Sequence, residues 1–225
     1  MKKIKVLLTK SFSDEYLKNF GADSIEWLQH PFITFNYKHL PHLQKQIEGI
    51  DAPFIFTSQN AVVGFEKNVA LNIESKVCFC LNGATQTALE SSGWKIIATA
   101  NSSERLAQKI IQSNIHEAIF CCGNIRMDVI PNKLQHAEIH LREFVVYETI
   151  FNPKVIENHF DAIVFFSPSG VESFFKMNRL QDPTKIYCLG EITASSLNIK
   201  AFKNIVISPT STSNSLLKII ADDSR

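Results

Sequence analysis

Short apolar runs alternate with helical patterns from one end of the chain to the other, and this alternation constrains the fold more than any other feature. The runs are almost uniformly apolar, as in Phe54–Ser58 and Ala162–Ser167, and show no alternation of apolar and polar residues. Such strands are typical of parallel sheets that helices cover on both faces. The sequence therefore predicts an α/β fold with doubly wound parallel sheets.

The expected elements follow from apolar runs, helical spacing and stop signals such as Gly21 and Gly93. The expected strands are Ile4–Thr9, Phe54–Ser58, Val77–Leu81, Ile96–Ala98, Ala118–Cys122, Ile139–Glu148, Ala162–Ser167, Lys185–Leu189 and Asn204–Ser208, with an extended segment Ile25–Phe35 broken by Pro31. The expected helices are Ser13–Gly21, Leu40–Ile50, Ala61–Lys67, Thr85–Ser91, Ser103–Gln112 with Ser103 as its cap, Arg126–Gln135, Pro153–His159, Gly170–Asn178, Thr193–Leu197 and Ser213–Asp222.

The two parts of the chain resemble one another. The run Ile55-Phe-Thr-Ser58 matches Val164-Phe-Phe-Ser167, and Thr85 matches Thr193 in the next junction of each part. Leu106 and Leu216 form a third pair, each in the expected helix that follows. The difference in residue number is nearly the same for all three pairs, and such near-constant offsets indicate two related α/β lobes.

Composition excludes several classes of protein. The chain has 225 residues, of which 45% are hydrophobic and 20% charged, so it is neither collagen-like nor disordered. A net charge of +1 gives the whole molecule no attraction for a nucleic acid or an acidic membrane, and we expect neither partner. The apolar run Val6–Leu8 is too short for a signal peptide, and no segment has the roughly 18 apolar residues of a membrane span. We therefore expect a cytoplasmic protein.

The five cysteines fall in expected strands, and their number is odd. We expect reduced, buried thiols, as in intracellular proteins. A metal site is the alternative, since Cys78 and Cys80 share one face of a strand. No Cys-x2-Cys pair occurs, and the adjacent Cys121 and Cys122 point to opposite faces, which argues against a metal.

Loops that enter helices hold the candidate functional residues. Nucleotide and hydrolase motifs such as Gly-x-Gly-x-x-Gly and Gly-x-Ser-x-Gly are absent. Helix starts present free N–H groups and a partial positive charge, which suit carboxylates, although helix capping alone explains any single residue. The repetition in two halves favours a shared polyanionic ligand. The junction residues are Ser58, Thr85, Gly123, Asn124, Ser167, Gly190 and Thr193.

Four short motifs occur in a fixed order along the chain. They are Cys122-Gly123-Asn124 leading into Ile130-Pro131, Val145-Val146-Tyr147-Glu148-Thr149, Phe165-Phe166-Ser167-Pro168-Ser169-Gly170 and Gly190-x-x-Thr193-Ala194. Together they resemble the uroporphyrinogen-III synthase family, over essentially the whole chain. The resemblance implies two flavodoxin-like lobes joined by two linker strands, with 1–33 and 150–225 in lobe 1 and the inserted 34–149 in lobe 2. It places the substrate in a cleft between the lobes.

The resemblance also implies an activity. The family converts hydroxymethylbilane, a linear tetrapyrrole with eight carboxylates, into uroporphyrinogen III, with inversion of the last pyrrole ring and loss of water. This implies a lyase of heme biosynthesis that uses no metal or organic cofactor. We expect a monomer, and a transient contact with the preceding enzyme of the pathway stays open.

Tyr147 corresponds to the active-site tyrosine of the family. A phenol with a pKa near 10 is a proton donor at neutral pH, although packing on a strand end is the alternative role. The resemblance gives Lys10 the place where many bacterial members carry arginine, and a solvated lysine is the alternative there. Asn82 stands where the family usually has glycine. The residues expected to hold the substrate are Lys10, Ser58, Thr85, Gly123, Asn124, Ser167, Gly190 and Thr193.

Two other functions remain open from the sequence. One is a non-catalytic tetrapyrrole- or anion-binding sensor of the same fold, which kept the cleft and lost the reaction. The other is a flavin or nucleotide domain, which the missing phosphate loops disfavour.

Overall fold

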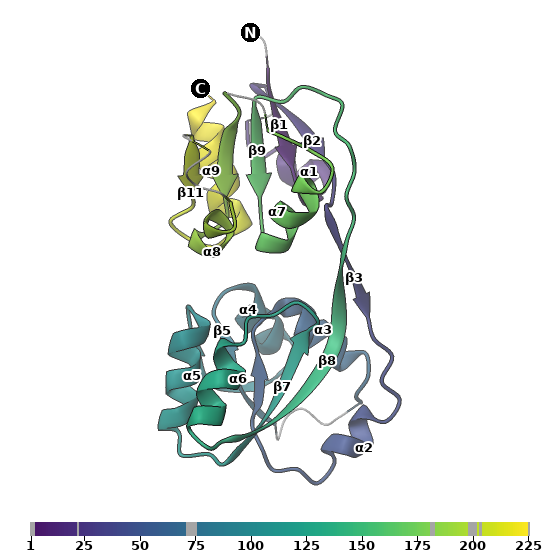
Figure 1. The fold of residues 1–225 in the computed structure, drawn as a ribbon, viewed down its shortest axis with the longest axis vertical. Helices are drawn as coiled ribbons and strands as arrows, with labels where there is room; N and C mark the ends of the chain where they lie inside the picture. The colour runs from purple at the N-terminus through teal and green to yellow at the C-terminus, as the bar shows by residue number, and fades with distance from the viewer. Residues whose placement is uncertain are drawn as a thin grey trace. The chain divides into compact units, whose positions relative to one another are not determined.

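The computed structural model describes residues 3–21, 23–70, 76–180, 183–197, 202 and 204–224. The chain divides into two compact units, each with its own sheet (Figure 1). Unit 1 comprises Met1–Thr34 and Ile150–Arg225, and unit 2 comprises Phe35–Thr149. The expected lobe boundaries, 33/34 and 149/150, differ from this division by one residue at the first crossing.

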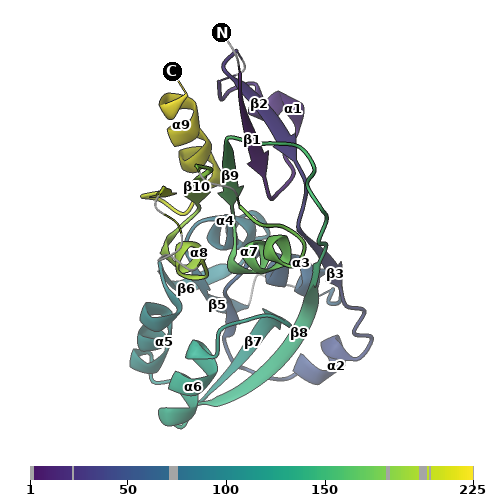
Figure 2. The same cartoon turned by 45° about the horizontal axis from the view of Figure 1, so that its top comes forward.

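The sheet of unit 1 has five parallel strands in the order β11-β10-β9-β1-β2 (Figures 1 and 2). Numbered 1 to 5 along the chain, the order is 2-1-3-4-5, which is the flavodoxin-like arrangement. The strands are β1 (Ile4–Leu8), β2 (Ile25–Gln29), β9 (Ala162–Phe165), β10 (Lys185–Cys188) and β11 (Ile205–Ile207). The helices are α1 (Asp14–Leu17), α7 (Pro168–Phe175), α8 (Glu191–Ser195) and α9 (Ser213–Asp223).

The sheet of unit 2 has the order β3-β8-β7-β4-β5-β6, in which β8 to β6 are parallel. Lys38 N–H donates to Val146 O and Asn152 N–H donates to Phe32 O, so β3 runs antiparallel to β8. The strands are β3 (Ile33–Tyr37), β4 (Phe54–Phe56), β5 (Val77–Leu81), β6 (Lys95–Ala100), β7 (Glu117–Gly123) and β8 (His140–Phe151). The helices are α2 (Leu43–Ile47), α3 (Gln59–Glu66), α4 (Ala84–Ser91), α5 (Ser103–Gln112) and α6 (Val129–His136).

The internal repeat extends to the strand order. In unit 2, β4 lies between β5 and β7, and in unit 1 its repeat partner β9 lies between β10 and β1. The series β6-β5-β4-β7-β8 therefore corresponds strand for strand to β11-β10-β9-β1-β2. The first two strands of the chain occupy in unit 1 the places that β7 and β8 occupy in unit 2.

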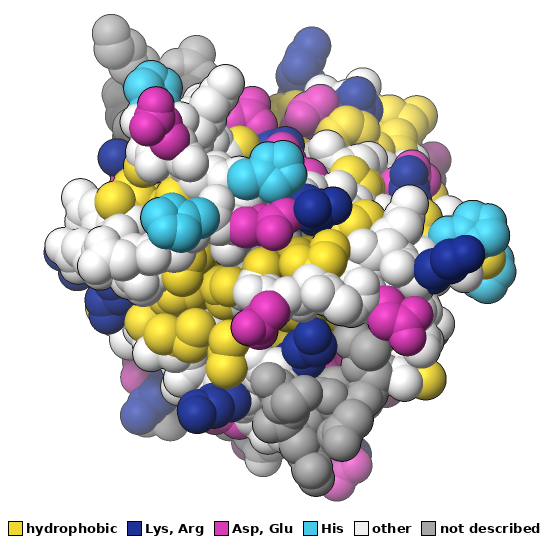
Figure 3. Space-filling model, turned by 90° about the horizontal axis from the view of Figure 1, so that it is seen from below, with side chains coloured by type: hydrophobic (Ala, Val, Ile, Leu, Met, Phe, Trp, Pro, Cys, Tyr) yellow, Lys and Arg dark blue, Asp and Glu magenta, His cyan; other side chains and the backbone are white. Residues whose placement is uncertain are grey.

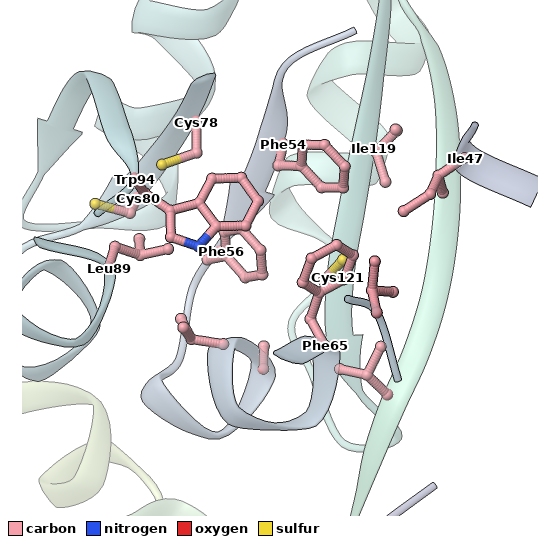
Figure 4. Close-up of a cluster of buried hydrophobic side chains, with 14 of the residues drawn as sticks. Ile47, Phe54, Phe56, Phe65, Cys78, Cys80, Leu89, Trp94, Ile119 and Cys121 are labelled. Carbon is pink, nitrogen blue, oxygen red and sulfur yellow. The ribbon is translucent and has the colours of Figure 1, made fainter. Parts of the chain in front are cut away.

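Each sheet is covered by buried apolar side chains on both faces, and every hydrophobic cluster lies within a single unit. One cluster of unit 2 is aromatic: the rings of Phe54, Phe56, Phe65 and Trp94 lie 5.1 to 6.2 Å apart, mostly edge to face (Figure 4). Edge-to-face pairs stabilise a core beyond their buried area. The uniform apolar character of the strands is thus explained by two-sided burial.

All five cysteines are free and buried, as expected. Cys78, Cys80 and Cys121 belong to one cluster of unit 2, whereas Cys122 belongs to the cluster on the opposite face. Burial raises the pKa of Cys78 and of Cys188 to about 12, so both thiols stay protonated at neutral pH. Buried, protonated thiols act as small apolar side chains.

One expected helix is absent. Residues 153–159 form no helix, because the amide of Asn178 binds their backbone instead: Asn178 Nδ2 donates to Lys154 O (2.7 Å) and Ile156 N–H donates to Asn178 Oδ1 (2.8 Å). A side chain that satisfies these backbone groups competes with helix formation.

Other elements differ at their ends. The α1 and α2 helices are shorter than expected, and the N-cap of α5 is Ser102, one residue before the expected cap. The Ser102 side chain accepts a hydrogen bond from Arg105 N–H, which fixes the start of the helix there.

Charges of both signs are mixed on the surface. On the face shown in Figure 3, basic and acidic side chains are interspersed. This distribution agrees with the net charge of +1.

Candidate functional site

The candidate residues of unit 2 lie at the carboxyl ends of neighbouring parallel strands. Ser58 follows β4, and Thr85 follows β5. Gly123 is the last residue of β7, Asn124 follows it, and Tyr147 lies beside Gly123 in β8. The direction in which successive strands are added reverses between β4 and β7, since the five parallel strands β4 to β8, numbered 1 to 5 along the chain, have the order 3-2-1-4-5. Ligands of open α/β sheets bind at such a switch point.

Ser58 and Tyr147 form the centre of this site. Ser58 is the N-cap of α3, and its Oγ accepts a hydrogen bond from Ala61 N–H (3.1 Å). The same Oγ lies 3.0 Å from the hydroxyl of Tyr147. Either hydroxyl can donate in this hydrogen bond, and when Ser58 donates to the phenol oxygen, the Tyr147 O–H is left to donate to a ligand.

The ring of Tyr147 lies against Gly123. A Cβ atom at Gly123 would lie 2.5 Å from Cζ of the ring, a distance that real contacts do not reach. Phe35 packs edge to face against the Tyr147 ring, with ring centroids 5.9 Å apart. Burial raises the pKa of Tyr147, and the hydrogen bond with Ser58 opposes this rise in part. The phenol is therefore a protonated donor at neutral pH.

The side chain of Asn124 is occupied by the neighbouring backbone. Its Oδ1 accepts from Ile125 N–H (2.9 Å) and from Thr149 N–H (2.8 Å), and its Nδ2 donates to Thr149 O (3.4 Å). Its own N–H donates to Tyr147 O (3.2 Å). The structure brings Asn124 to the site, with its amide directed at β8.

Thr85 lies at the next strand end. It is buried, 5% exposed, in the first turn of α4. The left-handed residue of this turn is Gly83, with φ of +80°, and Asn82 has no positive φ. Asn82, at the position where the family usually has glycine, therefore does not need a positive φ, because Gly83 adopts it instead.

The candidate residues of unit 1 lie at the same edge of their own sheet. Lys10 follows β1 and Ser167 follows β9, and the winding reverses between these two strands. Ser167 Oγ accepts from Gly170 N–H (3.1 Å), which repeats the cap of Ser58 in unit 2. Gly190 is the N-cap of α8, and Thr193, 5% exposed, lies inside that helix.

Lys10 is the candidate cation. Its ammonium lies 5.3 Å from the centre of the Phe12 ring and 6.0 Å from that of Phe166. The two rings cover part of the side chain, and this burial lowers the pKa of Lys10. Lys10 is nevertheless exposed, so that its ammonium is accessible to a carboxylate.

Sequence reasoning did not single out Gly64 or Phe35. A glycine in the interior of a helix, such as Gly64 in α3, could have been noticed in the sequence, because it destabilises the helix by up to about 1 kcal/mol relative to alanine.

Within the described ranges there is no group of three or more His, Cys, Asp or Glu side chains that could hold a metal ion. No helix in the described part of the chain is long and apolar enough to cross a membrane.

The fold and the two strand-end sites define a class: a two-unit, doubly wound α/β protein with hydroxyl and N–H groups at each switch point, a set of groups that suits carboxylates. A family model described as Uroporphyrinogen-III synthase HemD matches residues 14–218. The chain belongs to the uroporphyrinogen-III synthase family, whose members are cyclising lyases of porphyrin biosynthesis. The family, the fold class and the enzyme class predicted from the sequence are confirmed.

Solved structures support the fold. The crystal structure of uroporphyrinogen-III synthetase from Helicobacter pylori is 14% identical, with a TM-score of 0.68 over 99% of both chains. A mutant uroporphyrinogen III synthase from Thermus thermophilus is 15% identical, with a TM-score of 0.70 over 99% of this chain and 100% of that one. The chain therefore shares the arrangement of strands and helices with these two structures, although only 14% to 15% of the residues are identical.

Proposed function

We propose that the chain cyclises hydroxymethylbilane to uroporphyrinogen III, with loss of water and inversion of the last pyrrole ring. The observation that carries this proposal is the pair formed by Ser58 and Tyr147 at the switch point of unit 2, in a member of this family. It supplies one protonated phenol beside donors for carboxylates, which is what the departure of a hydroxyl from a polyanion requires.

Tyr147 acts as the proton donor. The C–O bond of the hydroxymethyl group breaks as the phenol proton passes to the departing oxygen, so that water leaves and an azafulvene cation remains. The raised pKa of Tyr147 keeps this proton in place until then. Ser58 donates to the phenol oxygen and stabilises the negative charge that develops on it.

The remaining predicted residues hold the substrate. Lys10 supplies a positive charge, and the strand-end loops supply hydroxyl and N–H groups. Uncatalysed closure gives the wrong isomer, so most of the enzyme's work is to hold a flexible chain in the geometry that passes through a spiro intermediate. Each single contact then contributes little. The proposed contacts are Lys10, Ser58, Thr85, Gly123, Ser167, Gly190 and Thr193, whereas the amide of Asn124, also expected from the sequence to hold the substrate, is engaged with Ile125 and Thr149.

We propose a cytoplasmic monomer that acts without a cofactor. Dehydration and ring closure need proton transfer and charge stabilisation only, and the residues above supply both. Five free thiols fit a reducing compartment.

The test is incubation of the protein with freshly made hydroxymethylbilane, followed by separation of isomers I and III. We expect isomer III in excess. Replacing Tyr147 by Phe removes the acid and leaves the ring, so kcat should fall by about 100-fold or more with little change in KM. Formation of isomer I alone by the unmodified protein would support the sensor instead, and unchanged kinetics in Tyr147→Phe would remove this residue from the reaction.

A further inference from the structure

The pairing of β7 with β8 slips by one residue next to Tyr147. Up to Cys122 the two strands pair one to one, with Cys122 opposite Val145. The next pair is Gly123 and Tyr147, so Val146 has no partner in β7. Such bulges occur next to active sites, where they re-aim a side chain.

The slip decides which face of the sheet Tyr147 occupies. Successive residues of a regular strand face opposite sides. Val145 packs against the cluster of Phe120, and Val146 packs in the cluster of Phe56 on the other face. Regular alternation would return Tyr147 to the face of Val145. Instead, Tyr147 lies in the same cluster as Val146, on the face that carries α3 and Ser58.

Two residues outside the Ser58–Tyr147 pair contact the slipped segment. Gly64 in α3 lies against the unpaired residue: a Cβ atom there would lie 2.7 Å from Val146 O, and a backbone carbonyl in a sheet cannot give way. On the other side, Asn124 extends β7 past its last pair. Its amide binds both Thr149 N–H and Thr149 O, and its N–H binds Tyr147 O.

We propose that Gly64 and Asn124 are positioning residues that hold the slip at Val146 and so aim Tyr147 at Ser58. This rests on the proposed function of Tyr147 and changes the expected role of Asn124, whose amide is engaged with β8 and not with a substrate carboxylate. Gly64 lets α3 approach β8 at Val146, and Asn124 fixes the part of β8 that follows Tyr147 through its hydrogen bonds with Thr149.

The first test compares Asn124→Ala with Asn132→Ala, an exposed asparagine on α6. Loss of the hydrogen bonds between the Asn124 amide and Thr149 should lower kcat about tenfold or more with KM nearly unchanged. A catalytic group that is misplaced by about 1 Å lowers the rate on the order of 100-fold. Asn132→Ala should retain both constants. A raised KM with unchanged kcat in Asn124→Ala would overturn the proposal and restore a carboxylate-binding role, and unchanged constants would also overturn it.

The second test needs no substrate. The tyrosinate absorbance of Tyr147, obtained as the difference from Tyr147→Phe, titrates above the ordinary value because the phenol is buried. In Asn124→Ala the pKa should fall towards about 10, because the released ring reaches solvent. An unchanged titration in the variant would contradict the proposal. If Tyr147→Phe keeps full activity while this pKa still falls, the role of Tyr147 in the reaction fails and its positioning stands.

Two further variants allow for misfolding of the first. Asn124→Asp keeps the acceptor for Thr149 N–H and loses the donor for Thr149 O, so its kcat should lie between those of the unmodified protein and Asn124→Ala. Gly64→Ala should give the same loss of kcat from the opposite side of the strand, with an unchanged KM. Normal kcat in a folded Gly64→Ala would remove Gly64 from the proposal.

Discussion

Tyr147 is buried, yet its hydroxyl has one hydrogen-bond partner that already accepts from another donor. Under the proposed function, Ser58 donates to the phenol oxygen, and the Tyr147 O–H is then available to donate to the substrate. Gly123 makes room for the ring and Phe35 packs against it. Four residues therefore decide where a single proton points.

Replacing Ser58 by Ala should have two separable effects. Loss of the cap should lower the free energy of unfolding by about 1 kcal/mol. Loss of the hydrogen bond to the phenolate should raise the pKa of Tyr147 further, because that bond favours the charged form. Urea unfolding and tyrosinate absorbance measure the two effects.

Ser102→Ala is the matched control for this substitution. Ser102 caps α5 through Arg105 N–H in the same unit, so the stability loss should be similar while kcat and the titration of Tyr147 stay unchanged. An equal rise of the Tyr147 pKa in both variants would mean that the effect of Ser58→Ala on this pKa comes from the loss of a helix cap and not from the loss of the hydrogen bond to the phenol.

The charge of Lys10 should make substrate binding depend on pH. Because burial lowers its pKa, Lys10 loses its charge at a lower pH than an ordinary lysine, and KM should rise as the pH rises through that value. Arginine stays charged throughout, so KM of Lys10→Arg should stay flat over the same range. Lys10→Met should raise KM about threefold to tenfold at neutral pH. A KM that rises equally with pH in Lys10→Arg would show that another group is responsible.

At the scale of elements, two asparagines at repeat-related positions carry out the same task. Asn68 follows α3, and its amide binds Lys38 O and Leu40 N–H, as Asn178 after α7 binds Lys154 O and Ile156 N–H. Their separation along the chain equals that of the repeat partners Leu106 and Leu216. The Asn68 amide thus connects the segment after β3 to the end of α3, and the Asn178 amide connects the segment after β8 to the end of α7.

Replacing either asparagine by Ala should destabilise its unit. In each variant two backbone groups of the segment and one helix carbonyl lose the amide as a partner, so the free energy of unfolding should fall by about 1 to 3 kcal/mol. Urea unfolding measures the loss. Asn132→Ala removes an exposed amide and should change the stability by less than about 0.5 kcal/mol. Equal stability of all three variants and the unmodified protein would show that the amides only follow the backbone.

These asparagines also explain which elements the sequence predicts and which it does not. The strand Val77–Leu81 is buried on both faces and has the bounds that its apolar run predicts, whereas the predicted runs Phe54–Ser58 and Ala162–Ser167 each end two residues later than the observed strand. The segment after Pro153 has helical composition, but its conformation depends on Asn178, which follows it only after β9 and α7. A contact between residues so far apart in the sequence leaves no pattern in the segment itself from which it could be predicted.

The same distinction holds for the site. The junction residues were predictable, since strand ends, helix starts and the family motifs are local patterns. The slip at Val146 was not, because it arises between two strands and depends on Gly64 from a third element. The sequence therefore predicts which residues reach the sheet edge but not how Tyr147 turns towards Ser58.

At the scale of the whole molecule, the five strands of unit 1 have counterparts in the same spatial order among the six strands of unit 2, and the hydrophobic clusters of each unit lie within that unit. Leu106 in α5 and Leu216 in α9 are repeat partners, and each is 0% exposed in a cluster of its own unit. A cavity at either leucine should therefore weaken one unit and leave the other as stable as before. The cysteines report this directly, because Cys188 lies in unit 1 and the other four lie in unit 2.

Leu216→Ala should lower the urea concentration at which Cys188 becomes reactive to an alkylating reagent, and Leu106→Ala should do so for Cys78, Cys80, Cys121 and Cys122 only. The expected loss in each case is about 2 to 5 kcal/mol, because a buried leucine leaves a cavity when it is truncated. Mass spectrometry of the labelled peptides separates the five thiols, and each variant serves as the control for the other. If both substitutions shift all five cysteines together, the two units unfold as one, and the separation of their cores does not extend to their stability.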